Sequence, residues 1–242
     1  MFKKPVKPEE VYEEFSTDTE SIFGSNLVSI YLHGSGARGE YVQGKSDINF
    51  LVVIESEGLK FLSGVWDHLD KWEKRAISAP LILTESYLSS SLDTFPLEFH
   101  NMKEANDLIF GKDLLENIII DDNDLRVQVE HELKAKLLSL RQGFMKTKGK
   151  RNELIDLISL SLPTFSAIFR GTLHLKKIEN KGTNSSELYD RVEETFELRK
   201  GLFQDLLNIK LGIGKWTTSE LIELMEEYMT TIRSIFRNVD KM

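Results

Sequence analysis

Apolar and polar residues follow two different periods along this chain, and the change of period divides it near residue 123. In the first half, short apolar or alternating runs predict strands at 27–33, 48–54, 80–83 and 97–102. Between these runs, apolar residues recur at helical spacing over 8–23, 59–75 and 85–92. Strands that alternate with helices in this way predict an α/β layer.

After residue 124 the pattern becomes helical throughout. Helices are predicted from residue 124, over 153–177, over 185–198, over 202–211, and after a capping box at Thr217 and Glu220. Consecutive amphipathic helices of this kind favour an antiparallel bundle. We therefore expect an α/β (α+β) domain at residues 1–122 and an all-α helical bundle domain at residues 123–242.

A glycine-rich segment, HGSGARG at residues 33–39, directly follows the first predicted strand. Glycine permits tight turns and lets backbone N–H groups approach an anion without an intervening side chain. If residues 37–40 begin a helix, its N-terminal N–H groups and the Ser35 hydroxyl would point at a phosphate. The segment therefore predicts a phosphate-binding turn.

The second predicted strand begins with the sequence SDINF at residues 46–50. Side chains alternate faces along a strand, so Asp47 and Asn49 project to one side while Ile48 and Phe50 enter the core. Two carboxylates so placed hold a pair of Mg²⁺ ions about 3.5–4 Å apart for displacement at phosphorus. Asn49 is an amide, whose oxygen can bind Mg²⁺ but neutralises no charge.

Together, GSGARG (34–39) and SDIN (46–49) resemble the Gly-Ser and Asp-x-Asp signature of the DNA polymerase beta-like nucleotidyltransferase superfamily, and most closely its minimal and aminoglycoside branches. The resemblance implies a mixed sheet with flanking helices, followed in the aminoglycoside enzymes by a helical domain. It also implies that Gly34 and Ser35 bind the nucleotide, that Asp47 binds both nucleotide and metal, and that Arg38 lies near the phosphates or braces the loop. Asn49 stands where the family has an acid.

The family uses a third carboxylate as metal ligand or general base. Residues 96–102 alternate apolar and polar side chains, so a strand there would place Glu98 and His100 on one face. By resemblance, Glu98 is the candidate for this role. Asp121 is its competitor, although the acids of residues 121–124 are expected to cap the next helix.

Composition narrows the classes of function. The 242 residues include no cysteine, which excludes disulfides, thiolate metal sites and cysteine nucleophiles. A net charge of −8 argues against general nucleic-acid binding. Residues 134–151 are a local exception, because they include seven basic residues and no acid. Two interpretations stay open for this segment, a solvated helix end or a flap that contacts phosphates. Without an apolar leader, the chain is expected to be cytoplasmic and not membrane-spanning.

The leading hypothesis is an enzyme that transfers a nucleoside monophosphate, expected to be AMP from ATP, to a hydroxyl of a small molecule or protein. Mg²⁺ would be held by Asp47, Asn49 and Glu98, and Glu98 would accept the hydroxyl proton. The alternative is a nucleotide-binding pseudoenzyme or a regulatory, antitoxin-like partner with a weakened metal site. A homodimer stays open.

Two further groups have open interpretations. Arg170 and His174 resemble the Arg-His motif of helical ribonucleases, at a shorter spacing. Acidic residues of the last helices could line a site for a polycationic acceptor, or they could be ordinary solvent-exposed residues. They are Glu193, Glu194, Glu197, Glu223, Glu226 and Glu227.

Overall fold

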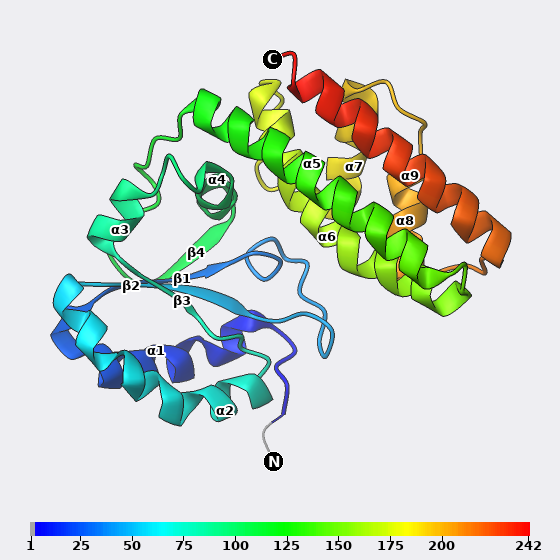
Figure 1. The fold of residues 1–242 in the computed structure, drawn as a ribbon. Helices are drawn as coiled ribbons and strands as arrows, with labels where there is room; N and C mark the ends of the chain where they lie inside the picture. The colour runs from blue at the N-terminus through cyan, green and yellow to red at the C-terminus, as the bar shows by residue number, and fades with distance from the viewer. Residues whose placement is uncertain (1–2) are drawn as a thin grey trace. The chain divides into compact units, whose positions relative to one another are not determined.

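The computed structural model describes residues 3–242, which divide into two compact units. Unit 1 is Met1–Ile120 and unit 2 is Asp121–Met242. Figure 1 shows the sheet and its covering helices in unit 1 and the helices of unit 2. The expected architecture, a mixed sheet with flanking helices plus a C-terminal all-α region, is confirmed.

Unit 1 is built on a four-stranded sheet within the described residues, in the order β3-β2-β1-β4. The strands are β1 (Leu27–His33), β2 (Asn49–Ile54), β3 (Leu81–Thr84) and β4 (Asn106–Gly111). Strand β1 pairs antiparallel with both β2 and β4, and β2 pairs parallel with β3. The helices of unit 1 are η1 (Pro8–Val11), α1 (Tyr12–Phe23), η2 (Gly24–Asn26), η3 (Ser56–Val65), α2 (Trp66–Lys74), α3 (Glu85–Ser90) and α4 (Pro96–Glu104).

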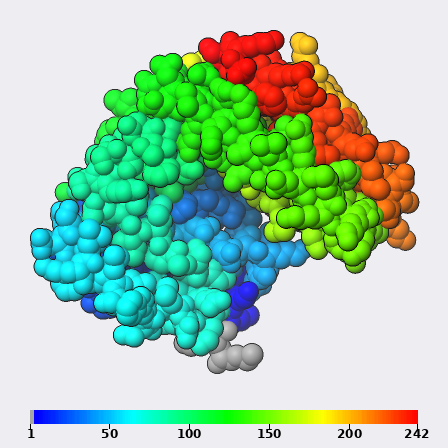
Figure 2. Space-filling model, in the orientation of Figure 1, coloured from blue at the N-terminus to red at the C-terminus, as the bar shows by residue number. Residues whose placement is uncertain are grey.

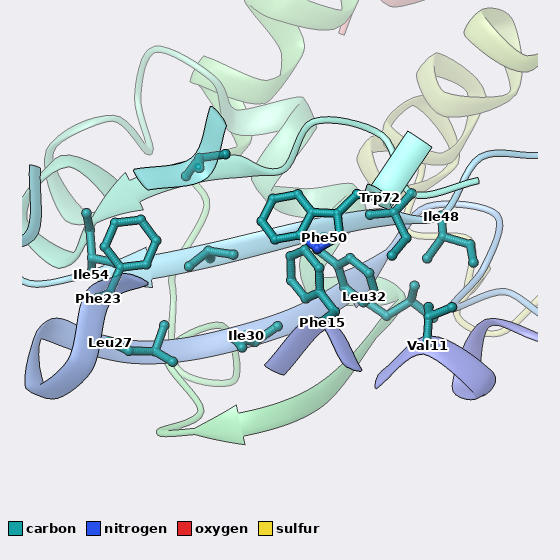
Figure 3. Close-up of a cluster of buried hydrophobic side chains, with 13 residues drawn as sticks. Val11, Phe15, Phe23, Leu27, Ile30, Leu32, Ile48, Phe50, Ile54 and Trp72 are labelled. Carbon is teal, nitrogen blue, oxygen red and sulfur yellow. The ribbon is translucent and has the colours of Figure 1, made fainter. Parts of the chain in front are cut away.

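Alternate side chains of the central strands enter two separate hydrophobic clusters, one on each face of the sheet. On one face, Phe50 of β2 stacks on Phe15 of α1 with ring centroids 4.0 Å apart, and Trp72 of α2 lies beside them (Figure 3). On the other face, the cluster includes Leu51 and Phe99, which belong to β2 and α4. Period-two alternation thus places Asn49 of β2 on the same face of the sheet as Leu51, the face that α4 covers.

One prediction for unit 1 is corrected. Residues 96–102 form part of helix α4 instead of a strand, and the edge strand β4 follows it. Pro96 occupies the first turn of α4, a position where its missing N–H costs nothing. A half-buried strand would expose its polar side chains, but His100 is buried together with the apolar residues. The alternation of apolar and polar residues in this segment therefore does not indicate a strand.

Unit 2 consists of helices within its described residues, and they are α5 (Asp122–Thr147), α6 (Arg151–Leu175), α7 (Ser185–Thr195), α8 (Leu202–Leu211) and α9 (Thr218–Val239). The predicted capping box at Thr217 and Glu220 is confirmed, and Asn184 with Glu187 forms another before α7. Helix α6 packs against α5, α7, α8 and α9, and it continues through Pro163. Its length and apolarity would also suit a membrane span, but its contacts are those of a core helix.

A buried carboxylate fixes the start of α8. Glu193 of α7 is 4% exposed, and its two oxygens accept hydrogen bonds from the N–H groups of Gly201 and Phe203, at 2.6 and 2.8 Å. These N–H groups are among those that a helix start leaves without intrahelical partners. Glu193 therefore has a structural role within unit 2 and does not contribute to an acidic surface.

Replacing Glu193 by Gln puts an amide N–H where a carboxylate oxygen accepts a backbone hydrogen bond. Because a buried N–H of α8 then loses its acceptor, we expect unit 2 to lose about 2 kcal/mol of unfolding free energy. Urea unfolding followed by circular dichroism measures the change. Glu194→Gln, at the exposed neighbouring position, is the matched control. Equal stability of the two variants would contradict this role.

In unit 1, Asp18 of α1 ties that helix to α2. It accepts hydrogen bonds from the Lys71 ammonium at 2.7 Å and the Trp72 indole at 2.9 Å. Burial acts to raise the pKa of Asp18, but these hydrogen bonds outweigh it and hold the pKa below its usual value. Because the folded-state pKa is the lower one, this stabilisation is present above the unfolded-state pKa and is lost as pH falls through the folded value.

We therefore expect Asp18→Asn to lower the unfolding free energy of unit 1 at neutral pH by about 1–3 kcal/mol. The difference from the wild type should begin to shrink as pH falls below about 4, the unfolded-state pKa, and should disappear below the lower folded-state pKa, where the wild-type carboxyl is neutral as well. Tryptophan fluorescence in urea titrations at several pH values reports it. Glu57→Gln, which breaks an exposed ion pair with Lys60, is the control. A difference that does not change with pH would refute this assignment.

Candidate functional site

The glycine-rich segment forms a tight turn at the end of β1. Residues 34–39 are all in turn conformation, with the Gly39 N–H donating to the Gly36 carbonyl and the Glu40 N–H to the Ser35 carbonyl. Gly34 has φ +74°, which side-chain-bearing residues rarely adopt. Residues 37–40 do not begin a helix, so any anion here would meet the N–H groups of a turn and not a helix N-terminus.

The start of β2 lies directly beside this turn. In the β1–β2 ladder His33 pairs with Asn49, and partners across such a ladder project to the same face. A Cβ added at Gly34 would lie 3.4 Å from the amide nitrogen of Asn49. The structure thus brings the predicted phosphate turn and Asn49 together on the face of the sheet that α4 covers.

Asp47 lies two residues before Asn49, ahead of the bridge that joins Ile48 to Ile77. Its side chain is exposed. Figure 2 shows the surrounding segment, coloured light blue, reaching the surface of the face in view. Asp47 is therefore accessible to a ligand that approaches the turn from solvent.

His33 contributes a neutral group to this region. Burial of the imidazole, together with the positive charge of Arg38, lowers the pKa of His33 from 6.5 to about 4. At neutral pH the side chain is therefore uncharged. It adds neither a cation for phosphates nor repulsion toward a metal ion.

Arg38 connects the turn to helix α4. Its Nη2 donates to the Asn101 carbonyl at 3.2 Å, one of the last carbonyls of the helix. The side-chain amide of Asn106 donates to the next two carbonyls of the helix, those of Met102 and Lys103. A guanidinium at a helix C-terminus satisfies free carbonyls and complements the helix dipole. Of the two roles expected for Arg38, these contacts support bracing of the loop.

Glu98 lies in the first turn of α4 and is exposed, whereas His100 is buried. Residues two apart point in nearly opposite directions from a helix, so the predicted shared face of Glu98 and His100 is wrong. Glu98 and Asn101, three apart, do share a side of α4. The contact of Arg38 with the Asn101 carbonyl brings the C-terminal half of this helix to the turn. The catalytic and metal-binding roles of Glu98 stay predictions.

Ser78 is a site residue that sequence analysis did not identify. Its hydroxyl donates to the Asn49 side-chain oxygen at 2.8 Å, and its N–H donates to the Ile48 carbonyl. A serine between two apolar runs carries no signal by itself. Only the parallel pairing of β2 with β3 brings residue 78 beside Asn49.

Acidic side chains are sparse around the turn, and the metal-binding roles of Asp47 and Asn49 stay predictions. Among residues 3–242, no cluster of three or more His, Cys, Asp or Glu side chains could hold a metal ion. Asn49 is neutral, and its oxygen is engaged by Ser78. Asp47 alone could hold a Mg²⁺ ion that arrives with a triphosphate, because this ion keeps several of its water ligands and needs only one or two carboxylates.

Several other candidates have structural roles. Asp121 is the N-cap of α5, where its side chain accepts hydrogen bonds from the N–H groups of Asn123 and Asp124. Arg170 is buried and donates to the Thr183 hydroxyl, while His174 pairs with Asp122 at 3.3 Å. These contacts separate Arg170 from His174, so the structure gives no support to a ribonuclease motif.

The basic stretch at residues 134–151 lies mostly on α5 and forms ordinary surface ion pairs. Lys134 pairs with Glu130, Lys136 with Glu132 and Lys150 with Glu153. These contacts favour the interpretation as a solvated helix end. A cavity of about 340 Å³ lies beside α3 and residues 114–119, and none of the predicted site residues lines it.

Comparisons with known proteins support the fold. No family model matches the chain, and no curated protein matches it. Among solved structures, the chain is similar to the spectinomycin adenyltransferase AAD(9) from Enterococcus faecialis, solved with ATP and spectinomycin. The identity is 13%, the TM-score is 0.55, and the match covers 93% of this chain and 99% of that one. The chain thus has the fold of an aminoglycoside-branch nucleotidyltransferase over nearly its whole length.

The contact between Arg38 and α4 can be tested directly. Arg38→Gln removes the charge that caps α4, so we expect faster hydrogen exchange of the last α4 amides and a loss of about 1–2 kcal/mol in stability. Exchange measured by mass spectrometry, with exposed Lys45→Gln as control, checks this. If nucleotide affinity falls while α4 exchange is unchanged, Arg38 binds phosphate and does not brace the loop.

Proposed function

We propose that this chain binds a nucleoside triphosphate, expected to be ATP, at the turn after β1 and transfers its nucleoside monophosphate to a hydroxyl acceptor. One observation carries the proposal: the glycine turn and the start of β2 lie side by side, so that a Cβ built at Gly34 would lie 3.4 Å from the Asn49 amide nitrogen. The fold shared with an ATP-bound adenyltransferase supports the same assignment.

The proposed roles follow from position. The turn N–H groups of Gly34 and Ser35 and the Ser35 hydroxyl would bind phosphate oxygens. Asp47, exposed two residues before Asn49, would hold Mg²⁺ that enters with the nucleotide, and this ion would neutralise phosphate charge when bound. Arg38 joins the turn to α4, and Glu98, exposed in the first turn of that helix, would then act at the nucleotide.

In the proposed reaction, an acceptor oxygen bonds to the α-phosphorus, and the bond from that phosphorus to the bridging oxygen of the leaving group breaks. Pyrophosphate leaves, and Glu98 accepts the hydroxyl proton.

The similar enzyme was solved with spectinomycin, which supports a small hydroxylated acceptor for this chain. Of the acids considered for an acceptor wall, Glu193 is buried and Glu227 pairs with Arg199, whereas Glu194, Glu197, Glu223 and Glu226 are exposed.

A second candidate is nucleotide binding without useful turnover, as in a pseudoenzyme or regulatory partner. The engaged oxygen of Asn49 and the lack of an acid cluster in residues 3–242 favour it. Losing about 4 kcal/mol of transition-state stabilisation lowers a rate about a thousandfold, which would leave binding as the main function. The cytoplasmic location and the homodimer stay predictions.

Nucleotide binding tests the common part of both candidates. We expect ATP to bind, and Gly34→Ala to weaken binding at least tenfold, because an added methyl strains a positive φ and crowds the phosphate position. Gly44→Ala introduces the same backbone strain at φ +79°, but the added methyl lies in open space. This variant should therefore bind ATP as tightly as the wild type. Isothermal titration calorimetry measures both. Equal affinities would contradict a nucleotide site at the turn.

Turnover separates the two candidates. For an enzyme, release of pyrophosphate from Mg·ATP with a pool of hydroxylated acceptors should fall at least a hundredfold in Asp47→Ala and in Glu98→Gln. Glu116→Gln, also exposed in unit 1, should retain the activity. If the wild type binds ATP but releases no pyrophosphate above background, the second candidate holds.

A further inference from the structure

Asn49 occupies the position of a metal-binding acid, but its orientation is fixed by Ser78. The Ser78 hydroxyl donates to the Asn49 side-chain oxygen at 2.8 Å. Ser78 is itself held by the backbone, because its N–H donates to the Ile48 carbonyl at 3.1 Å and Ile48 donates to the Ala76 carbonyl at 2.7 Å. The serine therefore keeps the amide oxygen of Asn49 turned toward the neighbouring chain segment.

The opposite end of the amide faces the glycine turn. The Asn49 nitrogen is the atom nearest to a Cβ built at Gly34, at 3.4 Å. An amide nitrogen carries two N–H donors and cannot bind a cation. The proposed phosphate contacts of the turn are backbone N–H groups, so Asn49 would add further hydrogen-bond donors beside them.

A carboxylate at residue 49 would behave in the opposite way. Its oxygens would repel phosphate oxygens unless a cation lay between them, which is the arrangement of a two-metal site. With an amide nitrogen in this place, a phosphate oxygen can be bound directly.

We propose that Asn49, held by Ser78, donates a hydrogen bond to a phosphate oxygen of the bound nucleotide and replaces the second metal ion. This deepens the proposed function and rests on it. Nucleotide affinity should therefore depend only weakly on divalent cations. Asp47 is then the one carboxylate at the site whose repulsion of the triphosphate a cation would have to balance. Ser78 acts as a positioning residue for Asn49.

The test is calorimetry with a non-hydrolysable ATP analogue, in Mg²⁺ and in EDTA, for the wild type and two variants. The wild type should lose less than about fivefold in affinity in EDTA. Asn49→Asp should lose more than about fiftyfold in EDTA and recover in Mg²⁺, because a donor becomes a repelling carboxylate. Ser78→Ala frees the amide to rotate, so its affinity in EDTA should fall about three- to tenfold. Ser90→Ala, an exposed serine of α3, is the control.

The outcomes are distinguishable. Equal metal dependence of the wild type and Asn49→Asp, with Ser78→Ala also unchanged, would overturn the role of Asn49 and leave the proposed function standing. Tighter binding of the analogue by Asn49→Asp in EDTA would do the same. No binding of the analogue by the folded wild type in either buffer would overturn the proposed function itself. Circular dichroism shows that each variant is folded.

Discussion

The antiparallel pairing of β1 with β2 is the constraint on which the site depends. It places His33 opposite Asn49, and the glycine turn therefore begins beside the residue that starts β2. A slip of one residue would move Asn49 to the other face of the sheet, under α1 and α2. Alternate residues of both strands, such as Leu32 and Phe50, are fully buried in the cluster with Phe15, so a slip would also expose the core. The hydrophobic pattern thus fixes the geometry of the polar site.

The polar residues on this framework differ from a two-metal site in a specific way. Where paired acids would bind cations, the chain has one exposed acid, Asp47, and an amide whose oxygen is engaged by Ser78. The turn, the Asn49 amide and the neutral His33 suit direct contact with phosphate. Arg38 joins this turn to α4 through the Asn101 carbonyl. The proposed nucleotide binding rests on these features, whereas the proposed transfer chemistry would depend further on Asp47 and Glu98.

Local sequence predicted the parts of the structure that local forces determine. Strand β1, the turn at residues 34–39 and the Thr217 capping box all have short-range signals and form where expected. Residues 96–102 were wrongly predicted as a strand, because alternation over a few residues does not distinguish a strand from a helix when His100 is buried. Edge strand β4 and the contact of Ser78 with Asn49 arise from long-range pairing, which no local pattern reveals.

The most direct test is a crystal structure with a non-hydrolysable ATP analogue and Mn²⁺, whose anomalous signal counts the metal ions. We expect the triphosphate on the N–H groups of Gly34 and Ser35, a phosphate oxygen within hydrogen-bond distance of the Asn49 amide nitrogen, and no more than one Mn²⁺, beside Asp47. A nucleotide bound away from the turn, or a second Mn²⁺ coordinated by the Asn49 oxygen, would contradict this arrangement.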